Sequence, residues 1–273
     1  MKDLMATQKD KISNLYNPEY LIQDFKRALL NDEFVVYFQP VYDIKSEQPY
    51  ILSCEALVRW IHPIYGLIMP SDFIPLFEQH GLICELDYFV WNESARQLSL
   101  WKEKYNCKLS VSVNISRLDI QDEAFEDKLL KIIEVNKLDI SDFHLELTEA
   151  SYLEISEKFV NVVKELQSKG FIIEIEDLGR DSASLNMLFS VQPDVIKMDR
   201  QYILLLINNR EKALKLVEIV HRIADTIKTP MAAEGVESID ELNILKETGF
   251  EMVQGYYFSK PLTALEFEKL LEQ

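Results

Sequence analysis

The sequence predicts an α/β fold, a TIM-type (β/α)8 barrel, and three observations support this. Short β-rich runs alternate with helical stretches along most of the chain, which is the order expected of strands joined by helices. Most runs end in a polar residue, as strands do at the rim of a barrel. A length of 273 residues suits one barrel, because single α/β barrels commonly have about 250. A doubly wound open sheet is the alternative.

The order of elements begins with a helix and continues with eight β-rich runs. Asn17 followed by Pro18 is typical of a helix start and predicts a helix from about Pro18 to Leu30. Later helices are indicated by apolar residues at helical spacing, the first series ending before Gly170, a suitable C-cap. The runs cover residues 34–42, 51–60, 109–115, 143–147, 171–175, 195–198, 230–233 and 252–258; the helical series are Phe159, Val162, Val163 and Leu166, and Ala213, Leu216, Val217, Val220 and Ala224.

Composition excludes several classes of protein. The formal charge of -17 repels polymeric nucleic acid and anionic membrane surfaces, so a phosphate ligand would need bound cations. Cys54, Cys84 and Cys107 have no metal-ligand spacing and suit a reducing compartment. No signal peptide or membrane-spanning run of about 20 apolar residues is recognisable, so we expect a cytoplasmic protein.

Residues at the predicted strand ends suggest a metal site. Parallel strands of a barrel bring their C-terminal ends to one rim, so these residues are expected to converge. The carboxylate and amide oxygens suit hard cations such as Mg²⁺ or Mn²⁺, and two adjacent carboxylates suit a pair of ions about 3.5–4 Å apart. The predicted ligands are Glu55, Asn114, Glu146, Glu176 and Asp177.

Other residues near these strand ends have candidate roles in catalysis and binding. Lys197 can hold the attacking water or neutralise developing charge, and Glu234 can act as general base. Gln39, Arg59 and Gln254 are candidates for holding the substrate, whereas Glu149 is expected to support a loop. Taken singly, each acidic residue is more often a solvated loop residue or helix cap, and Lys197 can form a structural ion pair. The four histidines are interpreted as structural, and the seven glycines form no phosphate-binding loop.

A series of motifs in order along the chain resembles the EAL domain family. The matching stretches are Phe38-Gln-Pro40, Cys54-Glu-Ala-Leu-Val-Arg-Trp60, Val113-Asn-Ile-Ser116, Glu146-Leu-Thr-Glu149, Lys197-Met-Asp199, Ala233-Glu-Gly-Val-Glu237 and Gln254-Gly-Tyr256. The resemblance runs from about Pro18 to the C-terminus, which suggests a leader or linker at 1–17 and a barrel domain at 18–273.

The resemblance implies a modified TIM barrel with one antiparallel strand, which hydrolyses cyclic di-GMP to linear pGpG with two Mg²⁺ or Mn²⁺ ions. By resemblance, Glu55, Asn114, Glu146 and Asp177 bind the metals and Lys197 orients the water. Glu234 assists as base or metal partner, and Gln254 completes the pocket; the substrate contacts are Gln39, Leu57 and Arg59. The family also implies a homodimer through the barrel face near the 177–190 loop, and an upstream sensor or cyclase domain.

One stretch departs from the family pattern. The family's Asp-Asp-Phe-Gly-Thr-Gly reads Glu176-Asp-Leu-Gly-Arg-Asp181, so Glu176 carries one methylene more than the usual aspartate. A shift near 1 Å at reacting atoms can cost about a hundredfold in rate. Three readings therefore stay open: an active phosphodiesterase, a receptor that binds cyclic di-GMP without cleaving it, and an interaction domain that has lost the nucleotide.

Overall fold

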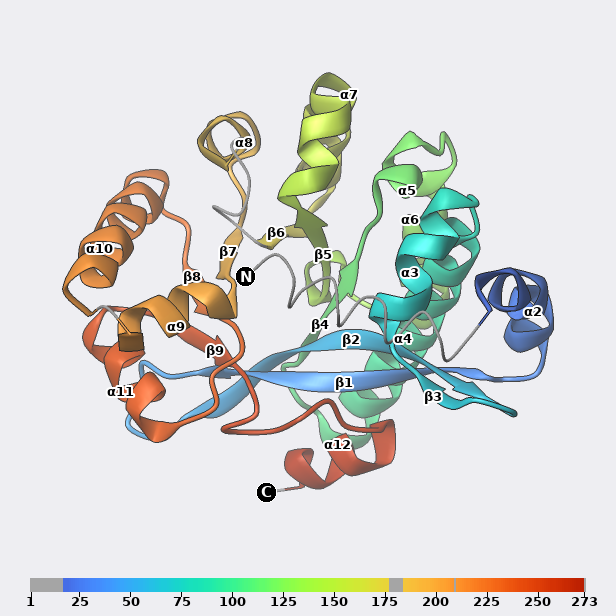
Figure 1. Cartoon of the computed structure of the whole chain (residues 1–273), viewed down its shortest axis with the longest axis horizontal. Helices are drawn as coiled ribbons and strands as arrows, with labels where there is room; N and C mark the ends of the chain where they lie inside the picture. Colours follow the sequence, from blue (N-terminus) through green and yellow to red (C-terminus); the bar gives the residue numbers. More distant parts are fainter. Residues whose placement is uncertain (1–16, 177–183, 209, 273) are drawn as a thin grey trace.

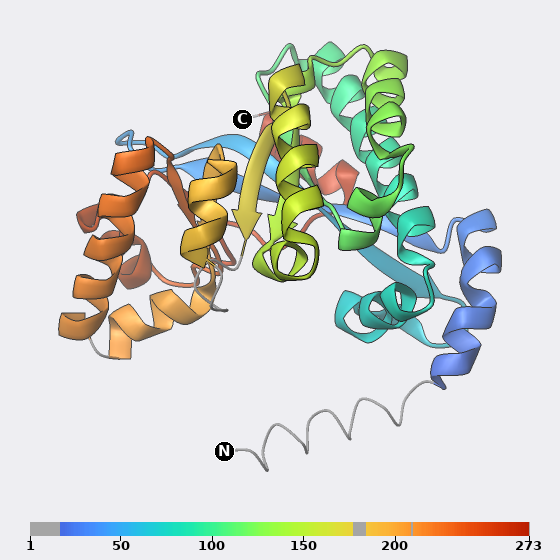
Figure 2. The same cartoon turned by 90° about the horizontal axis from the view of Figure 1, so that it is seen from above.

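The chain folds into a closed barrel of eight strands with helices outside it (Figures 1 and 2). The computed structural model describes residues 17–176, 184–208 and 210–272. Around the barrel the order is β1, β9, β8, β7, β6, β5, β4 and β2, and the β1–β2 pairing closes the ring. Strands β2 and β4 to β9 pair in parallel, as the predicted fold requires.

The strands lie close to the predicted runs. They are β1 Phe34–Asp43, β2 Tyr50–His62, β3 Gly66–Ile68, β4 Ser110–Asn114, β5 Phe143–Thr148, β6 Ile172–Glu176, β7 Val195–Met198, β8 Met231–Ala233 and β9 Met252–Gln254. The short β3 was not predicted. It pairs with the end of β2 outside the barrel and is visible at the right of Figure 1.

Strand β1 is the antiparallel strand that the family resemblance implies, because it runs against both of its neighbours, β2 and β9. Its ladder with β2 extends from Phe34 opposite Trp60 to Asp43 opposite Tyr50. The prediction that Gln39 and Glu55 close their strands was wrong. They face each other in the middle of this long hairpin, which continues beyond the barrel rim.

The predicted first helix, α2, covers Pro18–Leu30, and the Asn17 side chain accepts a hydrogen bond from the Glu19 amide at its start. The two helices predicted from apolar spacing also form. After α2, the helices are α3 Pro70–Gln79, α4 Ile83–Tyr105, α5 Arg117–Gln121, α6 Phe125–Asn136, η1 Ile140–Asp142, α7 Glu149–Lys169, α8 Ser184–Val191, α9 Arg200–Asn208, α10 Arg210–Ile227, α11 Ile239–Glu247 and α12 Ala264–Leu271. The two predicted from apolar spacing are α7 and α10. Within the described part of the chain, no helix has the length and apolarity needed to cross a membrane.

An aromatic cluster joins α2 and α3 to the outer end of the β1–β2 hairpin. Phe25, Phe34 and Phe77 pack against one another with ring centroids 4.8–6.3 Å apart. Trp60 and Phe73 complete the cluster, and all five side chains are almost fully buried. Aromatic contacts of this kind add to the free energy gained by burial. They fix the long hairpin, which carries Glu55 in its middle.

Candidate active site

Three acidic side chains from different strands converge inside the barrel. Glu55 lies on β2, Glu146 on β5, and Glu234 directly follows β8. A carboxylate oxygen of each lies within 4.8 Å of the others. The strand register explains this, because Asn114 on β4 pairs with Glu146, and the Glu234 amide continues the ladder by donating to the Met198 carbonyl at 3.0 Å.

Lys197 on β7 supplies the positive charge in this cluster. Its ammonium group is 2.6 Å from a Glu234 oxygen, 3.5 Å from Glu55, and in direct contact with Glu146. Only 2% of Lys197 is exposed. Burial disfavours its charged form, but the carboxylates of Glu146 and Glu234 outweigh this and raise the pKa of Lys197.

The donor set fits a hard divalent cation. Burial raises the pKa of Glu146 well above its usual range, and the nearby Glu55 carboxylate adds to the rise. Glu146 Oε2 and Gln254 Oε1 are buried, and neither has a hydrogen-bond partner among the described residues. Such oxygens are costly to leave unsatisfied, and carboxylate and amide oxygens are ligands that Mg²⁺ and Mn²⁺ prefer.

A chain of amide groups holds Glu55 from the opposite side. The Gln254 amide nitrogen donates to Glu55 Oε2 at 2.6 Å and to Gln39 Oε1 at 3.1 Å, and Gln39 in turn donates to the Ser259 carbonyl at 3.2 Å. Gly255 permits this arrangement, since a Cβ there would lie 2.2 Å from the Val236 backbone. Gln39 thus belongs to the support of Glu55.

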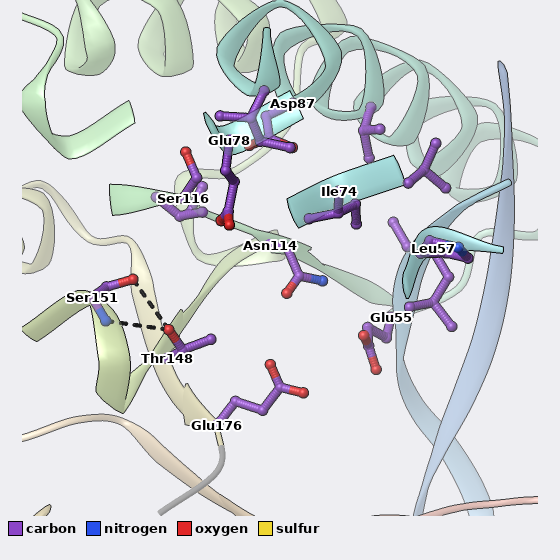
Figure 3. Close-up of a pocket in the computed structure, with 16 residues that line it drawn as sticks. Glu55, Leu57, Ile74, Glu78, Asp87, Asn114, Ser116, Thr148, Ser151 and Glu176 are labelled. Atoms are coloured by element: carbon purple, nitrogen blue, oxygen red, sulfur yellow. Dashed lines mark hydrogen bonds between the residues drawn. The ribbon is translucent and has the colours of Figure 1, made fainter. Parts of the chain in front are cut away.

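A cavity of about 310 Å³ opens beside the carboxylates (Figure 3). Glu55, Asn114 and Glu176 point into it from β2, β4 and β6. The Asn114 carbonyl accepts a hydrogen bond from the Trp91 indole of α4 at 3.1 Å, which fixes the end of β4. The remaining lining is largely apolar and includes Leu57, Pro70, Ile74, Ile83, Val90, Ile115, Thr148 and Ser151.

Sequence reasoning missed the acidic far end of this cavity, where Glu78, Asp87 and Ser116 lie (Figure 3). Burial raises the pKa of Asp87 well above its usual range, and the adjacent Asp119 contributes to the rise. Asp119 is itself buried and caps α5 by accepting from the Ser116 amide at 2.8 Å. The sequence signal that could have revealed this end of the cavity is Asp87, an aspartate on the apolar helix face that also carries Ile83 and Val90.

The predicted site residues fall into three groups. The structure brings together Glu55, Glu146, Lys197, Glu234 and Gln254, with Gln39, Leu57, Asn114 and Glu176 around them. Arg59 does not line the described cavity; its guanidinium lies 5.7 Å from the centroid of the Tyr37 ring. Asp177 and the altered positions after it lie outside the described residues. Glu149 begins α7, but its side chain also lies outside them.

Three of the histidines have defined hydrogen-bond partners, and that of His80 is the Leu76 carbonyl, 2.8 Å from Nδ1. His144 Nδ1 lies 2.6 Å from Glu174 Oε1 inside the barrel, and His62 Nε2 lies 3.0 Å from Asp24 Oδ2. His62 Nδ1 accepts from the Ile64 and Tyr65 amides at 3.1 and 3.2 Å. These contacts agree with the structural interpretation of these side chains.

Fold and site define an α/β barrel with a carboxylate-rich centre at the ends of its parallel strands. Residues 22–261 match the family description of the EAL domain. The chain therefore belongs to the EAL domain family.

Relatives and solved structures agree with this assignment. The chain is 33% identical over 253 residues to cyclic di-GMP phosphodiesterase PdeR of Escherichia coli (strain K12), covering 92% of this chain and 38% of that protein. The PaMucR phosphodiesterase in complex with c-di-GMP superposes with a TM-score of 0.85 at 28% identity, over 91% of this chain and 99% of that one. The EAL enzyme Bd1971, with cAMP and cyclic di-GMP bound, gives 0.87 at 26% identity, over 99% and 73%. The chain spans less than half the length of the curated relatives it matches.

Proposed function

We propose that this chain is a metal-dependent phosphodiesterase that hydrolyses cyclic di-GMP to linear pGpG. The observation that carries the proposal is the convergence of Glu55, Glu146 and Glu234 around Lys197, beside a cavity that Asn114 and Glu176 also enter. Membership of the EAL domain family and the likeness to PdeR and PaMucR support it.

Glu55, Asn114, Glu146, Glu176 and Asp177 would hold two divalent cations, Mg²⁺ or Mn²⁺. When bound, such ions neutralise phosphate charge and lower the pKa of a coordinated water. In the mechanism that we propose, Lys197 orients the attacking water and Glu234 accepts its proton. Gln254 and Gln39 keep the Glu55 carboxylate facing the cluster through their hydrogen bonds. Glu149 would support a loop near the site.

The cavity suits one guanine base of the substrate. Guanine presents N1–H and N2–H donors on one edge, and Glu78 and Asp87 offer carboxylate acceptors at the far end of the cavity. Leu57, Pro70 and Ile74 provide apolar surface for the faces of the ring. Arg59 would contact a phosphate, which requires its guanidinium to leave the Tyr37 ring.

A second candidate function is a receptor that binds cyclic di-GMP and does not cleave it. Glu176 favours this candidate, because it reaches the cavity with a longer side chain than the aspartate typical of the family. An interaction domain without nucleotide binding is disfavoured by the intact carboxylate cluster.

The deciding experiment measures linear pGpG formed from cyclic di-GMP by the purified protein, with Mg²⁺ and with Mn²⁺. A Glu55→Ala variant serves as control. Product that depends on metal and disappears in the variant supports the enzyme. Calorimetric binding of intact cyclic di-GMP without product supports the receptor, and neither binding nor product would contradict both proposals.

The remaining proposals concern the setting of the domain. We propose a cytoplasmic barrel domain at 18–273, joined through a linker at 1–17 to an upstream sensor or cyclase domain. The longer curated relatives support this, among them the bifunctional diguanylate cyclase/cyclic di-GMP phosphodiesterase MucR of Pseudomonas aeruginosa, of which the match covers 35%. A homodimer through the barrel face near residues 177–190 is supported by the exposed Phe189; the predicted loop is helical from residue 184, where α8 begins.

A further inference from the structure

The Lys197 ammonium occupies the place where the carboxylate oxygens of the cluster meet. It contacts Glu146 directly and lies 2.6 Å from Glu234 and 3.5 Å from Glu55. These are the same three residues whose oxygens lie within 4.8 Å of one another and could hold a metal ion. Lysine and metal therefore share their ligands.

The oxygens that Lys197 contacts, Glu146 Oε1 and Glu55 Oε2, cannot bind both cations at once. Mg²⁺ lies about 2.0–2.1 Å from its oxygen ligands, whereas an ammonium nitrogen needs about 2.7–2.9 Å. An ion centred among these oxygens would overlap the Lys197 ammonium. Two positive charges at that separation would also repel each other strongly in a buried site.

When they are ionised, these buried carboxylates require a compensating cation. Glu146 is 1% exposed and Glu55 is 7% exposed. Removing one member of a buried ion pair leaves an uncompensated charge, which is strongly destabilising. In the protein without metal, Lys197 compensates this charge. With metal bound, the ion can do so instead.

We propose that Lys197 is a resident counter-ion, which occupies the carboxylate cluster without metal and is displaced from Glu146 and Glu55 when metal binds. Displacement frees the ammonium to face the water and the phosphate, so metal occupancy both completes the site and releases its catalytic cation. This inference rests on the proposed metal dependence. The inference adds that the protein binds metal more weakly than it otherwise would, because the free energy of displacing Lys197 opposes binding.

The test compares the wild type with Lys197→Met by thermal unfolding and by calorimetric titration with MnCl₂, without substrate. Without metal, Lys197→Met is expected to have the lower Tm. Mn²⁺ is expected to raise the Tm of the variant by more than that of the wild type, and to bind it at least tenfold more tightly, since a tenfold change corresponds to about 1.4 kcal/mol. Lys131→Met, on the exposed face of α6, is the control that removes the same charge without touching the cluster.

The outcomes separate the counter-ion from metal binding itself. In one outcome, Mn²⁺ raises the Tm of Lys197→Met no more than that of the wild type, and binds it no more tightly, while still binding the wild type clearly. That result would refute the counter-ion role of Lys197 and leave the proposed metal site intact. No effect of Mn²⁺ on either protein overturns both.

A second measurement covers the case in which Lys197→Met does not fold. Crystal structures of the wild type, grown with and without Mg²⁺, show the position of Lys197 Nζ directly. Movement of Nζ out of hydrogen-bond distance of Glu146 in the Mg²⁺ form supports the proposal. An unmoved Nζ beside a bound ion contradicts it.

Discussion

Glu176 is the residue at which the proposed activity is most directly tested. Its carboxylate enters the cavity from the end of β6, with one methylene more than the aspartate that the family resemblance implies. We expect Glu176→Asp to raise kcat for cyclic di-GMP by about tenfold to a hundredfold, because shifts near 1 Å at reacting atoms have effects of this size. Initial rates of pGpG formation with Mn²⁺ test this. Glu134→Asp on α6 is the control, and an unchanged kcat would show that the site accommodates the glutamate.

Burial of Asp87 lowers the stability of the fold, and the same side chain is proposed to bind guanine. Its folded-state pKa is raised by burial and by Asp119, so its penalty is absent below the unfolded value near 3.8 and grows as pH rises toward the folded value. Asp87→Asn removes the penalty, and its Tm advantage over the wild type should therefore increase from about pH 4 to pH 7. Cyclic di-GMP should bind the variant about tenfold more weakly, because an amide nitrogen replaces a carboxyl oxygen that can accept from guanine. A pH-independent difference in Tm would refute the stability argument.

Strands β4, β5 and β6 carry a second polar layer below the site. His144 and Glu174 lie two residues before Glu146 and Glu176, and Ser112 also hydrogen-bonds Glu174. Burial opposes ionisation of Glu174, but the hydrogen bond from His144 and the charges of His144 and Lys197 leave its pKa below the usual value. The stability it provides is present above about pH 4.5 and is lost as pH falls through the folded pKa.

We expect Glu174→Gln to destabilise the barrel by about 3–5 kcal/mol at pH 7, where one partner of a buried pair is removed. The difference from the wild type should vanish in acid. Urea unfolding at several pH values measures it. The double variant His144→Leu with Glu174→Leu should recover most of the loss, because apolar replacements of buried pairs are often neutral. A double variant as unstable as Glu174→Gln would contradict the ion-pair explanation.

At the same scale, local signals and the closed barrel were predicted well, and the length of the β1–β2 hairpin was not. Pro18–Leu30 matched because Asn17 and Pro18 fix a helix start within a few residues. Gln39 and Glu55 were misplaced within their strands because the length of the β1–β2 ladder depends on packing against α2 and α3, which sequence spacing does not report. Asp87 was missed for a similar reason, since only the tertiary fold brings α4 to the cavity beside β4.

For the whole molecule, the surface near α8 is the candidate for self-association. Phe189 is 69% exposed and Ile219 on α10 is 57% exposed, and both line an apolar groove with Ile223 and Ile227. We expect Phe189→Asp to convert a dimer to a monomer in sedimentation experiments without changing the Tm of the barrel. Leu30→Asp, which alters an even more exposed apolar residue on α2, should leave the mass unchanged. A dimer that survives Phe189→Asp would place the interface elsewhere.

The reversal of β1 decides from which side the chain enters the barrel. In a barrel with all strands parallel, the first strand starts at the face opposite the site. Here Phe34 pairs with Trp60, beyond Glu55, so β1 starts on the side of the site and α2 lies there too. The described part of the chain therefore enters the barrel from the side that carries the site.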